Sequence, residues 1–155
     1  MIYENDTRLH PSKLGLISAL MYYRPLDVYA WYRNFNTVFR NDLESDAAIL
    51  AWALGSIPSY ESYLPKELAY LEGDWIYKLE GLGNRLRSDT VIGMEAVYNC
   101  LEGLEGSGEV GVKMREIRYD GQRILNTLQM IDEKYAKWNK AQVWEELENK
   151  LIQLN

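Results

Sequence analysis

The sequence predicts an all-α protein of five to seven helices, packed as an irregular bundle with a long, heptad-patterned helix near the carboxyl end. Three observations lead to this prediction. Apolar residues recur at steps of three and four, prolines and glycine-rich segments divide the chain into helix-length pieces, and the composition is that of a globular protein, with 47% hydrophobic and 26% charged residues. At 155 residues the chain is most simply one domain, residues 1–155.

Prolines mark the first two helices. Pro11 suits the first turn of a helix over about 11–23, and Pro25 ends it because the residue before a proline avoids helical backbone angles. A second helix is expected over about 26–40, where apolar and aromatic residues follow an i, i+3, i+4, i+7 pattern. Ser45 or Asp46 can cap a short third helix that ends at Gly55.

Two more helices are expected in the middle of the chain, which carries most of its negative charge. Pro65 opens the fourth helix, which ends near Glu80 because each glycine inside a helix costs about 1 kcal/mol relative to alanine. Ser88 or Asp89 can cap a fifth helix that continues to about residue 101. Residues 103–111 read GLEGSGEVG, a glycine-rich loop that separates an acidic N-terminal bundle from the C-terminal helical segment.

The most regular pattern runs from Met114 to Trp138, where apolar positions about 3.5 residues apart form one narrow stripe of a helix. Such a stripe must pack along another helix, in this chain or in a second copy. A second stripe begins in a shifted phase at Trp144, so this region is either a kinked helix or two helices with a break near Asn139. The candidate contact residues are Met114, Ile117, Ile124, Leu128, Ile131, Tyr135, Trp138, Trp144, Leu147, Leu151 and Leu154.

An alternative exists for residues 109–122. Apolar and other residues alternate at the start of this segment, and Asp120-Gly121 is a dipeptide typical of hairpin turns, so a strand pair competes with a helix that begins near Val112. The helix is favoured because residues 122–138 continue a helical pattern and leave no partner strand.

Motifs for catalysis or cofactor binding are weak. Residues 106–111 match GxGxxG, but two glutamates stand just before them and no strand–helix–strand alternation surrounds them, so a flexible helix connection is favoured over a dinucleotide site. His10 is the only histidine and is interpreted as a helix-entry residue; Cys100 is the only cysteine and is interpreted as a small buried hydrophobe. We therefore expect no catalytic residues, no metal and no cofactor.

Two alternatives to a purely structural role stay open. Glu67, Glu72 and Asp74 could converge in a cleft and serve a small enzyme, although helical carboxylates beside lysines more often form a solvated surface. The basic cluster in residues 113–123 could bind nucleic acid, but the net charge of −6 repels phosphate backbones and disfavours this.

The composition also bears on location. One cysteine excludes an internal disulfide, the first nine residues have no signal-peptide core, and the longest nearly uncharged stretch, 14–23, is too short to span a bilayer. We expect a soluble, cytoplasmic protein that does not enter a membrane. Its 12 tyrosines and five tryptophans suit both core edges and contact surfaces.

Residues 115–118 (REIR) and 121–125 (GQRIL) resemble a helical segment of the urease accessory protein F family. Members of that family are all-helical, dimeric and non-enzymatic, and they act as assembly chaperones. The resemblance therefore implies a helical fold and a role in assembly. It covers about ten of the 155 residues and lacks the family's proline–glycine N-terminal signature, so no functional residue is carried over.

Taken together, these features predict a non-catalytic assembly, scaffold or adaptor protein that acts through helix-mediated contacts with a protein partner or with itself, as a homo-oligomer. A viral or chaperone-like assembly component fits this description.

Overall fold

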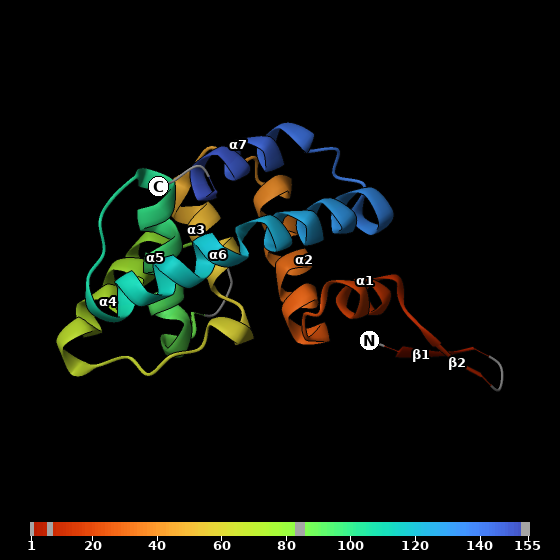
Figure 1. Ribbon diagram of the computed structural model, residues 1–155, viewed down its shortest axis with the longest axis horizontal. Helices are drawn as coiled ribbons and strands as arrows, with labels where there is room; N and C mark the ends of the chain where they lie inside the picture. The colour runs from red at the N-terminus through yellow and green to blue at the C-terminus, as the bar shows by residue number, and fades with distance from the viewer. Residues whose placement is uncertain (1, 6–7, 83–85, 153–155) are drawn as a thin grey trace.

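The structure, a computed structural model, describes residues 2–5, 8–82 and 86–152, with side chains from residue 12 onward. It is a helical bundle, which confirms the all-α class (Figure 1). Its helices within the described residues are α1 (Lys13–Met21), α2 (Pro25–Arg40), α3 (Ala47–Gly55), α4 (Ala69–Lys78), α5 (Val91–Glu102), α6 (Gly108–Ile131) and α7 (Ala141–Leu151). Short 3-10 turns at Pro58–Tyr60, Lys66–Leu68 and Ser88–Thr90 lie between them.

The amino end forms a small hairpin that the sequence analysis did not predict. Strand β1 (Ile2–Asn5) pairs antiparallel with β2 (Arg8–Pro11), so that Tyr3 lies opposite His10. Figure 1 shows this hairpin projecting beyond α1. The expectation that His10 and Pro11 open the first helix was therefore wrong, because both residues belong to β2.

Capping explains where two helices begin. Ser12 precedes α1, and its Oγ accepts a hydrogen bond from Gly15 N at 3.0 Å. Asp46 caps α3 as predicted, with its Oδ1 accepting from Ala48 N and Ile49 N. These side chains satisfy amide donors that have no partner inside the first turn of a helix.

The other predicted caps differ from the structure. The fourth helix begins at Ala69, after a 3-10 turn, rather than at Pro65. Before α5, Ser88 and Asp89 form a 3-10 turn, and neither caps the helix with its side chain. The Asp89 carboxylate instead accepts hydrogen bonds from the Arg87 guanidinium. Thr90 is the residue immediately before α5.

Helices α3 and α5 are packed against each other through two glycines. A Cβ atom on Gly55 would lie 2.7 Å from the backbone N and Cα of Met94, and one on Gly93 would lie 2.9 Å from Tyr60 Cβ. Real Cβ atoms do not approach backbone this closely, so glycine is required for this crossing. The contact places α3 and α5, whose residues are mostly buried, in the centre of the bundle.

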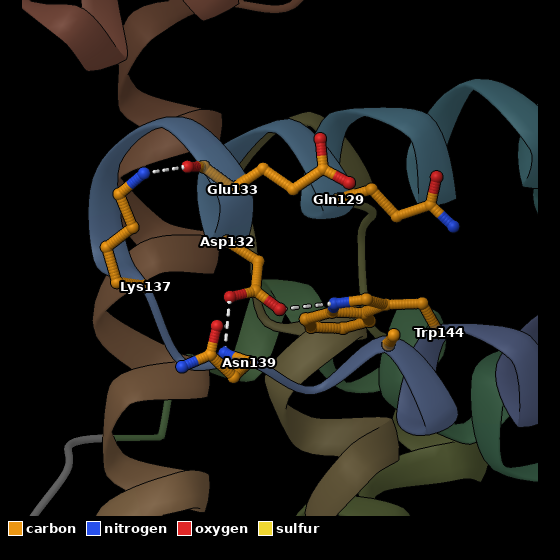
Figure 2. Close-up of a pocket in the computed structure, with 7 residues that line it drawn as sticks. Gln129, Asp132, Glu133, Lys137, Asn139 and Trp144 are labelled. Atoms are coloured by element: carbon orange, nitrogen blue, oxygen red, sulfur yellow. Dashed lines mark hydrogen bonds between the residues drawn. The ribbon is translucent and has the colours of Figure 1, made fainter.

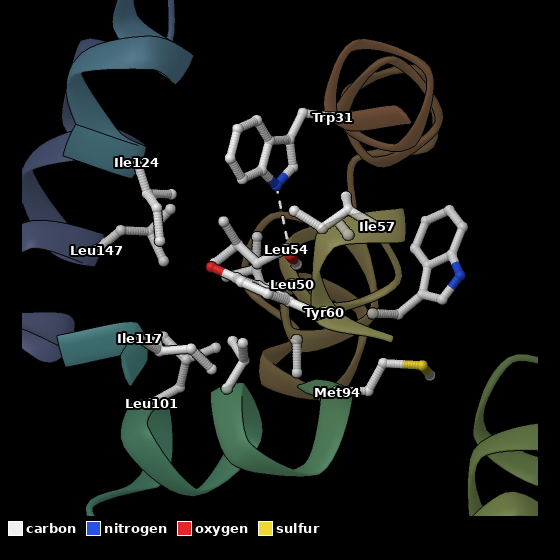
Figure 3. Close-up of a cluster of buried hydrophobic side chains, with 14 of the residues drawn as sticks. Trp31, Leu50, Leu54, Ile57, Tyr60, Met94, Leu101, Ile117, Ile124 and Leu147 are labelled. Carbon is white, nitrogen blue, oxygen red and sulfur yellow. Dashed lines mark hydrogen bonds between the residues drawn. The ribbon is translucent and has the colours of Figure 1, made fainter. Parts of the chain in front are cut away.

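The core around this crossing receives side chains from five helices. The Trp31 indole of α2 lies inside it and donates a hydrogen bond to the Leu54 carbonyl at 3.3 Å. Figure 3 shows the surrounding side chains of α3, α5, α6 and α7, including Leu50, Leu54, Met94, Leu101, Ile117, Ile124 and Leu147. The polar atom of the buried tryptophan is thus paired, as burial requires.

The stripe predicted over residues 114–138 lies on α6 only as far as Ile131, because α6 is one continuous helix from Gly108 to Ile131 and not a hairpin. Helix α6 packs on α1, α2, α5 and α7. Gly121, within the stripe, permits a close approach, because a Cβ there would lie 3.0 Å from Ile152 Cγ1. The chain's own helices therefore cover the stripe.

This burial changes the role expected for the candidate contact residues. Eight of them lie in the core of the chain, namely Met114, Ile117, Ile124, Leu128 and Ile131 of α6 and Trp144, Leu147 and Leu151 of α7. Tyr135 is 40% exposed and Trp138 is half-buried, and both lie beyond the end of α6. Leu154 lies outside the described residues. The eight buried side chains offer no surface to a partner, so a core role replaces the contact role predicted for them.

The carboxyl-terminal region is two helices rather than one kinked helix. After α6, residues Asp132–Ala136 form a π-helical turn, and Lys137 and Asn139 then adopt left-handed backbone angles with φ of 56° and 61°. Left-handed residues cannot continue a right-handed helix. The break thus falls where the apolar pattern changes phase, and α7 returns along α6.

Aromatic packing holds this connection against α2. The Trp138 ring stacks on Tyr32 with centroids 6.0 Å apart and contacts Phe39 at 5.1 Å, and its Nε1 donates to Asn36 Oδ1 at 3.3 Å. Trp144 contacts Phe39 at 5.7 Å. Part of the tyrosine and tryptophan content is thus explained as packing at the edge of the core.

The glycine-rich loop is shorter than the predicted 103–111, because residues 108–111 form the start of α6. Residues 104–107 connect the left-handed C-cap of α5, Gly103, to Gly108. Helix α6 packs directly on α5 across this loop.

Within the described part of the chain, we find no helix with the length and apolar character needed to cross a bilayer.

Candidate functional site

A cavity of about 390 Å³ lies where α6 ends and α7 begins, and the side chain of Asp132 forms its inner wall (Figure 2). Asp132 is 5% exposed. Its Oδ1 accepts from Asn139 N at 2.8 Å, and its Oδ2 accepts from Lys140 N at 2.9 Å and from Trp144 Nε1 at 2.8 Å. Three donors therefore compensate the loss of water around this carboxylate.

The geometry assigns Asp132 a structural task. Lys140 is the residue before α7, and its own side chain makes no capping hydrogen bond. Asp132 instead binds the amides of Asn139 and Lys140, the two residues just before α7, and the indole N–H of Trp144 in its first turn. A buried aspartate at the end of α6 thus anchors the start of α7 against the preceding helix.

The rest of the cavity offers little for acid–base chemistry. Glu133 is the other carboxylate among the lining residues, and its side chain is exposed. The Lys137 ammonium donates to the Glu133 carbonyl, as Figure 2 shows. The arrangement lacks a second buried acid beside Asp132, which a general acid–base pair requires.

The carboxylates considered for an enzyme do not form a cleft. Glu67 and Asp74 are exposed on the outer side of the α4 region, and Glu72 accepts a hydrogen bond from the Ser88 hydroxyl. None of the three lines the five best-defined cavities of the described residues. The enzyme alternative therefore gains no structural support from these residues.

The basic cluster of residues 113–123 is largely engaged within the chain. Lys113 pairs with Glu116 at 2.9 Å, and Arg123 pairs with Asp120 at 3.6 Å and lies over the Tyr23 ring at 4.4 Å. Because these cations are already paired within the chain, they are less available to bind the phosphates of a nucleic acid.

Arg118 and Cys100 lie near each other in the same part of α5 and α6. Burial raises the pKa of the Cys100 thiol, and the Arg118 guanidinium opposes this rise through a hydrogen bond and its charge. A buried, protonated thiol is a poor nucleophile, which agrees with the interpretation of Cys100 as a small hydrophobe.

The GxGxxG segment does not have the surroundings of a dinucleotide site. Helix α5 precedes it, not a strand. Its glycines serve packing, since a Cβ on Gly106 would collide with the sulfur of Met114 and one on Gly111 would lie 2.8 Å from the Gly106 carbonyl oxygen. No cluster of three or more metal-ligating side chains occurs in the described residues.

Sequence reasoning noted that the tyrosines suit contact surfaces but did not locate the exposed apolar surface on α1 and α2. We name it the apolar–basic face: Leu16, Leu20, Tyr22, Leu26 and Tyr29, flanked by the exposed Lys13, Arg24 and Arg33. A cavity of about 440 Å³ adjoins it, lined by Leu26, Tyr29, Arg33 and Arg87 among others. The signal was present in the sequence of α1, KLGLISALM, which is apolar on every side although only one side can face the core.

Helical spacing explains how this face is built. Lys13, Leu16 and Leu20 follow an i, i+3, i+7 pattern on α1, and Leu26, Tyr29 and Arg33 repeat it on α2. The two helices contact each other and are joined by three residues, so the two stripes lie on consecutive, packed helices. Leu20 is 63% exposed and Leu26 is 67% exposed.

Comparison of the chain with protein-family models, with curated proteins and with solved structures finds no match. The resemblance of residues 115–125 to the urease accessory protein F family is thus neither supported nor contradicted.

Proposed function

We propose that this protein is a non-catalytic assembly, scaffold or adaptor protein that binds another protein through the apolar–basic face. One observation carries the proposal: two consecutive helices present five large apolar side chains to solvent. Contiguous exposed apolar surface rimmed by polar residues is typical of protein interaction sites. The stripe on α6 cannot serve this purpose, because its side chains are used in the core.

The chemistry of the face supports the same proposal. Tyrosine supplies large contact area with few rotatable bonds, and arginine is enriched at the centres of protein interfaces. Asp27, the one acidic residue between 12 and 40, is buried and accepts from Ser59 N at 3.1 Å. The exposed charges within residues 12–40 are therefore all positive, whereas Glu61 and Asp89 pair with Arg87 at the adjoining cavity.

A photo-crosslinking residue placed at position 20 tests the proposal. We expect protein adducts from this position and none from the control position 119, since Tyr119 is 90% exposed on α6 and lies outside the face. Leu26→Ser should remove the adducts while the far-ultraviolet circular dichroism stays unchanged. Equal labelling from positions 20 and 119 would refute the proposal.

A further inference from the structure

We infer that the apolar–basic face binds the exposed side of α4 of a second copy of this chain, which gives a head-to-tail assembly. This inference rests on the proposed function and names the partner of the same face. It follows from two surfaces of opposite charge that both expose large apolar or aromatic side chains and that lie on different helices, α1 and α2 for one and α4 for the other.

The second surface is formed by α4, and we name it the apolar–acidic face. Tyr70, Gly73, Asp74 and Tyr77 lie on one stripe of the helix at i, i+3, i+4 and i+7, and all four are exposed. Tyr77 is 81% exposed. The inner side of the same helix buries Leu71 and Trp75, so the stripe points away from the core.

The charges of the two regions are complementary. Residues 12–40 contain four basic side chains and one acidic side chain, a net charge of +3, whereas residues 62–80 contain two basic and four acidic side chains, a net charge of −2. Glu61 is left out of this count because it pairs with Arg87 beside the apolar–basic face. One of the two lysines near α4, Lys78, lies over the rings of Trp75 and Tyr98 at 4.9 and 4.5 Å. Opposite potentials favour encounter of these faces and disfavour pairing of either face with itself.

The positions of the faces decide the geometry. Figure 1 shows α4 toward one end of the long axis and α1 toward the other. One molecule cannot bring its own two faces together, but two molecules can join α4 of one to α1 and α2 of the next. Such a contact is heterologous, so it extends to a chain of molecules or closes into a ring.

Shape also permits the contact. The cavity beside Leu26 and Tyr29 is an opening of about 440 Å³ with Arg33 and Arg87 in its lining. A tyrosine ring with a neighbouring carboxylate, as Tyr77 and Asp74 provide, is the chemistry that such a lining accepts. Arg87 already binds Glu61 and Asp89, which leaves Arg33 as the cation to test.

Charge exchange in the full chain tests the inference by sedimentation velocity. We expect the wild-type chain to form concentration-dependent oligomers, and Arg33→Glu or Asp74→Lys alone to weaken association about tenfold or more, since each creates like-charge contacts. An equal mixture of the two variants should associate again, because each new charge then meets its opposite. Arg115→Glu, at an exposed site on α6, is the matched control and should associate like the wild type.

The contrary outcomes are distinct. A chain that stays monomeric at tens of micromolar, or variants that do not restore each other, would overturn the inference. If position 20 still crosslinks to a different protein, the proposed function survives while self-assembly fails; if position 20 crosslinks to nothing, both fail. Binding of the monomer to vesicles containing phosphatidylserine, lost in Arg33→Glu, would assign the face to an anionic lipid surface and also overturn the inference.

Discussion

Replacement of Asp132 by alanine should destabilise the protein by about 3–5 kcal/mol, because one side chain holds the end of α6, the connection and α7 together. The variant removes the acceptor of three hydrogen bonds, those from Asn139 N, Lys140 N and Trp144 Nε1. A hydrogen bond to a charged group contributes about 1.5–3 kcal/mol, so simple addition would overestimate the loss. The two amides border a cavity, where water can replace part of the interaction, while the Trp144 donor is buried.

The conservative variant Asp132→Asn removes the negative charge of the side chain but keeps its volume, so it measures the contribution of the charge to stability. An asparagine has one acceptor oxygen, and its amide group must face at least one of the three N–H donors. We expect a loss of about 1–3 kcal/mol, smaller than that of the alanine variant. Glu133→Gln is the control, since this exposed neighbour in the same cavity should change stability by no more than about 0.5 kcal/mol.

Urea denaturation followed by circular dichroism measures these losses, and hydrogen exchange locates them. The amides of Asn139 and Lys140 should exchange faster in both Asp132 variants, while amides in α3 should follow global unfolding. A loss below about 1 kcal/mol in Asp132→Ala, or an equal loss in Glu133→Gln, would refute the structural role assigned to this carboxylate.

Three further predictions concern the core. Leu128→Ala should cost about 2–5 kcal/mol in urea denaturation, because Leu128 is fully buried, and a cost below about 0.5 kcal/mol would contradict its placement. Gly55→Ala should destabilise the protein by about 1–3 kcal/mol, because the added Cβ atom would collide with α5. Gly73→Ala should stabilise it by about 0.5–1 kcal/mol, because a Cβ atom there meets no atom within 4 Å and alanine favours the helix. Changes of the same sign in the two variants would disprove the role assigned to Gly55. Burial raises the pKa of Tyr60 well above its ordinary value of 10.0, so the unfolded state loses its proton first, and stability that is complete below about pH 10 falls as the pH rises further. Thermal unfolding across alkaline pH should show a smaller fall in Tyr60→Phe, and an identical fall would remove Tyr60 as its cause.

The limits of sequence reasoning are clearest on α6 and α1. The heptad stripe correctly indicated a helix with one buried side, but periodicity measures only the need for burial and carries no information about what covers it. The cover is α7 and the central helices of the same chain. On α1 the apolar residues surround the helix, so their spacing does not indicate which side faces the core, and the structure leaves Leu16 and Leu20 in solvent.

The sequence by itself determined what depends on neighbours along the chain. Asp46 caps α3, Arg24-Pro25 divides α1 from α2, and the phase change near Asn139 marks the break before α7, because capping, proline geometry and helical periodicity act within a few residues.

Only the tertiary structure decided what depends on distant residues meeting. The close crossing at Gly55, the anchoring of the start of α7 by Asp132, and the placement of the two faces on different helices all follow from packing between helices. Such contacts are selected by the shape and volume of the whole core, and no local spacing of residues encodes them.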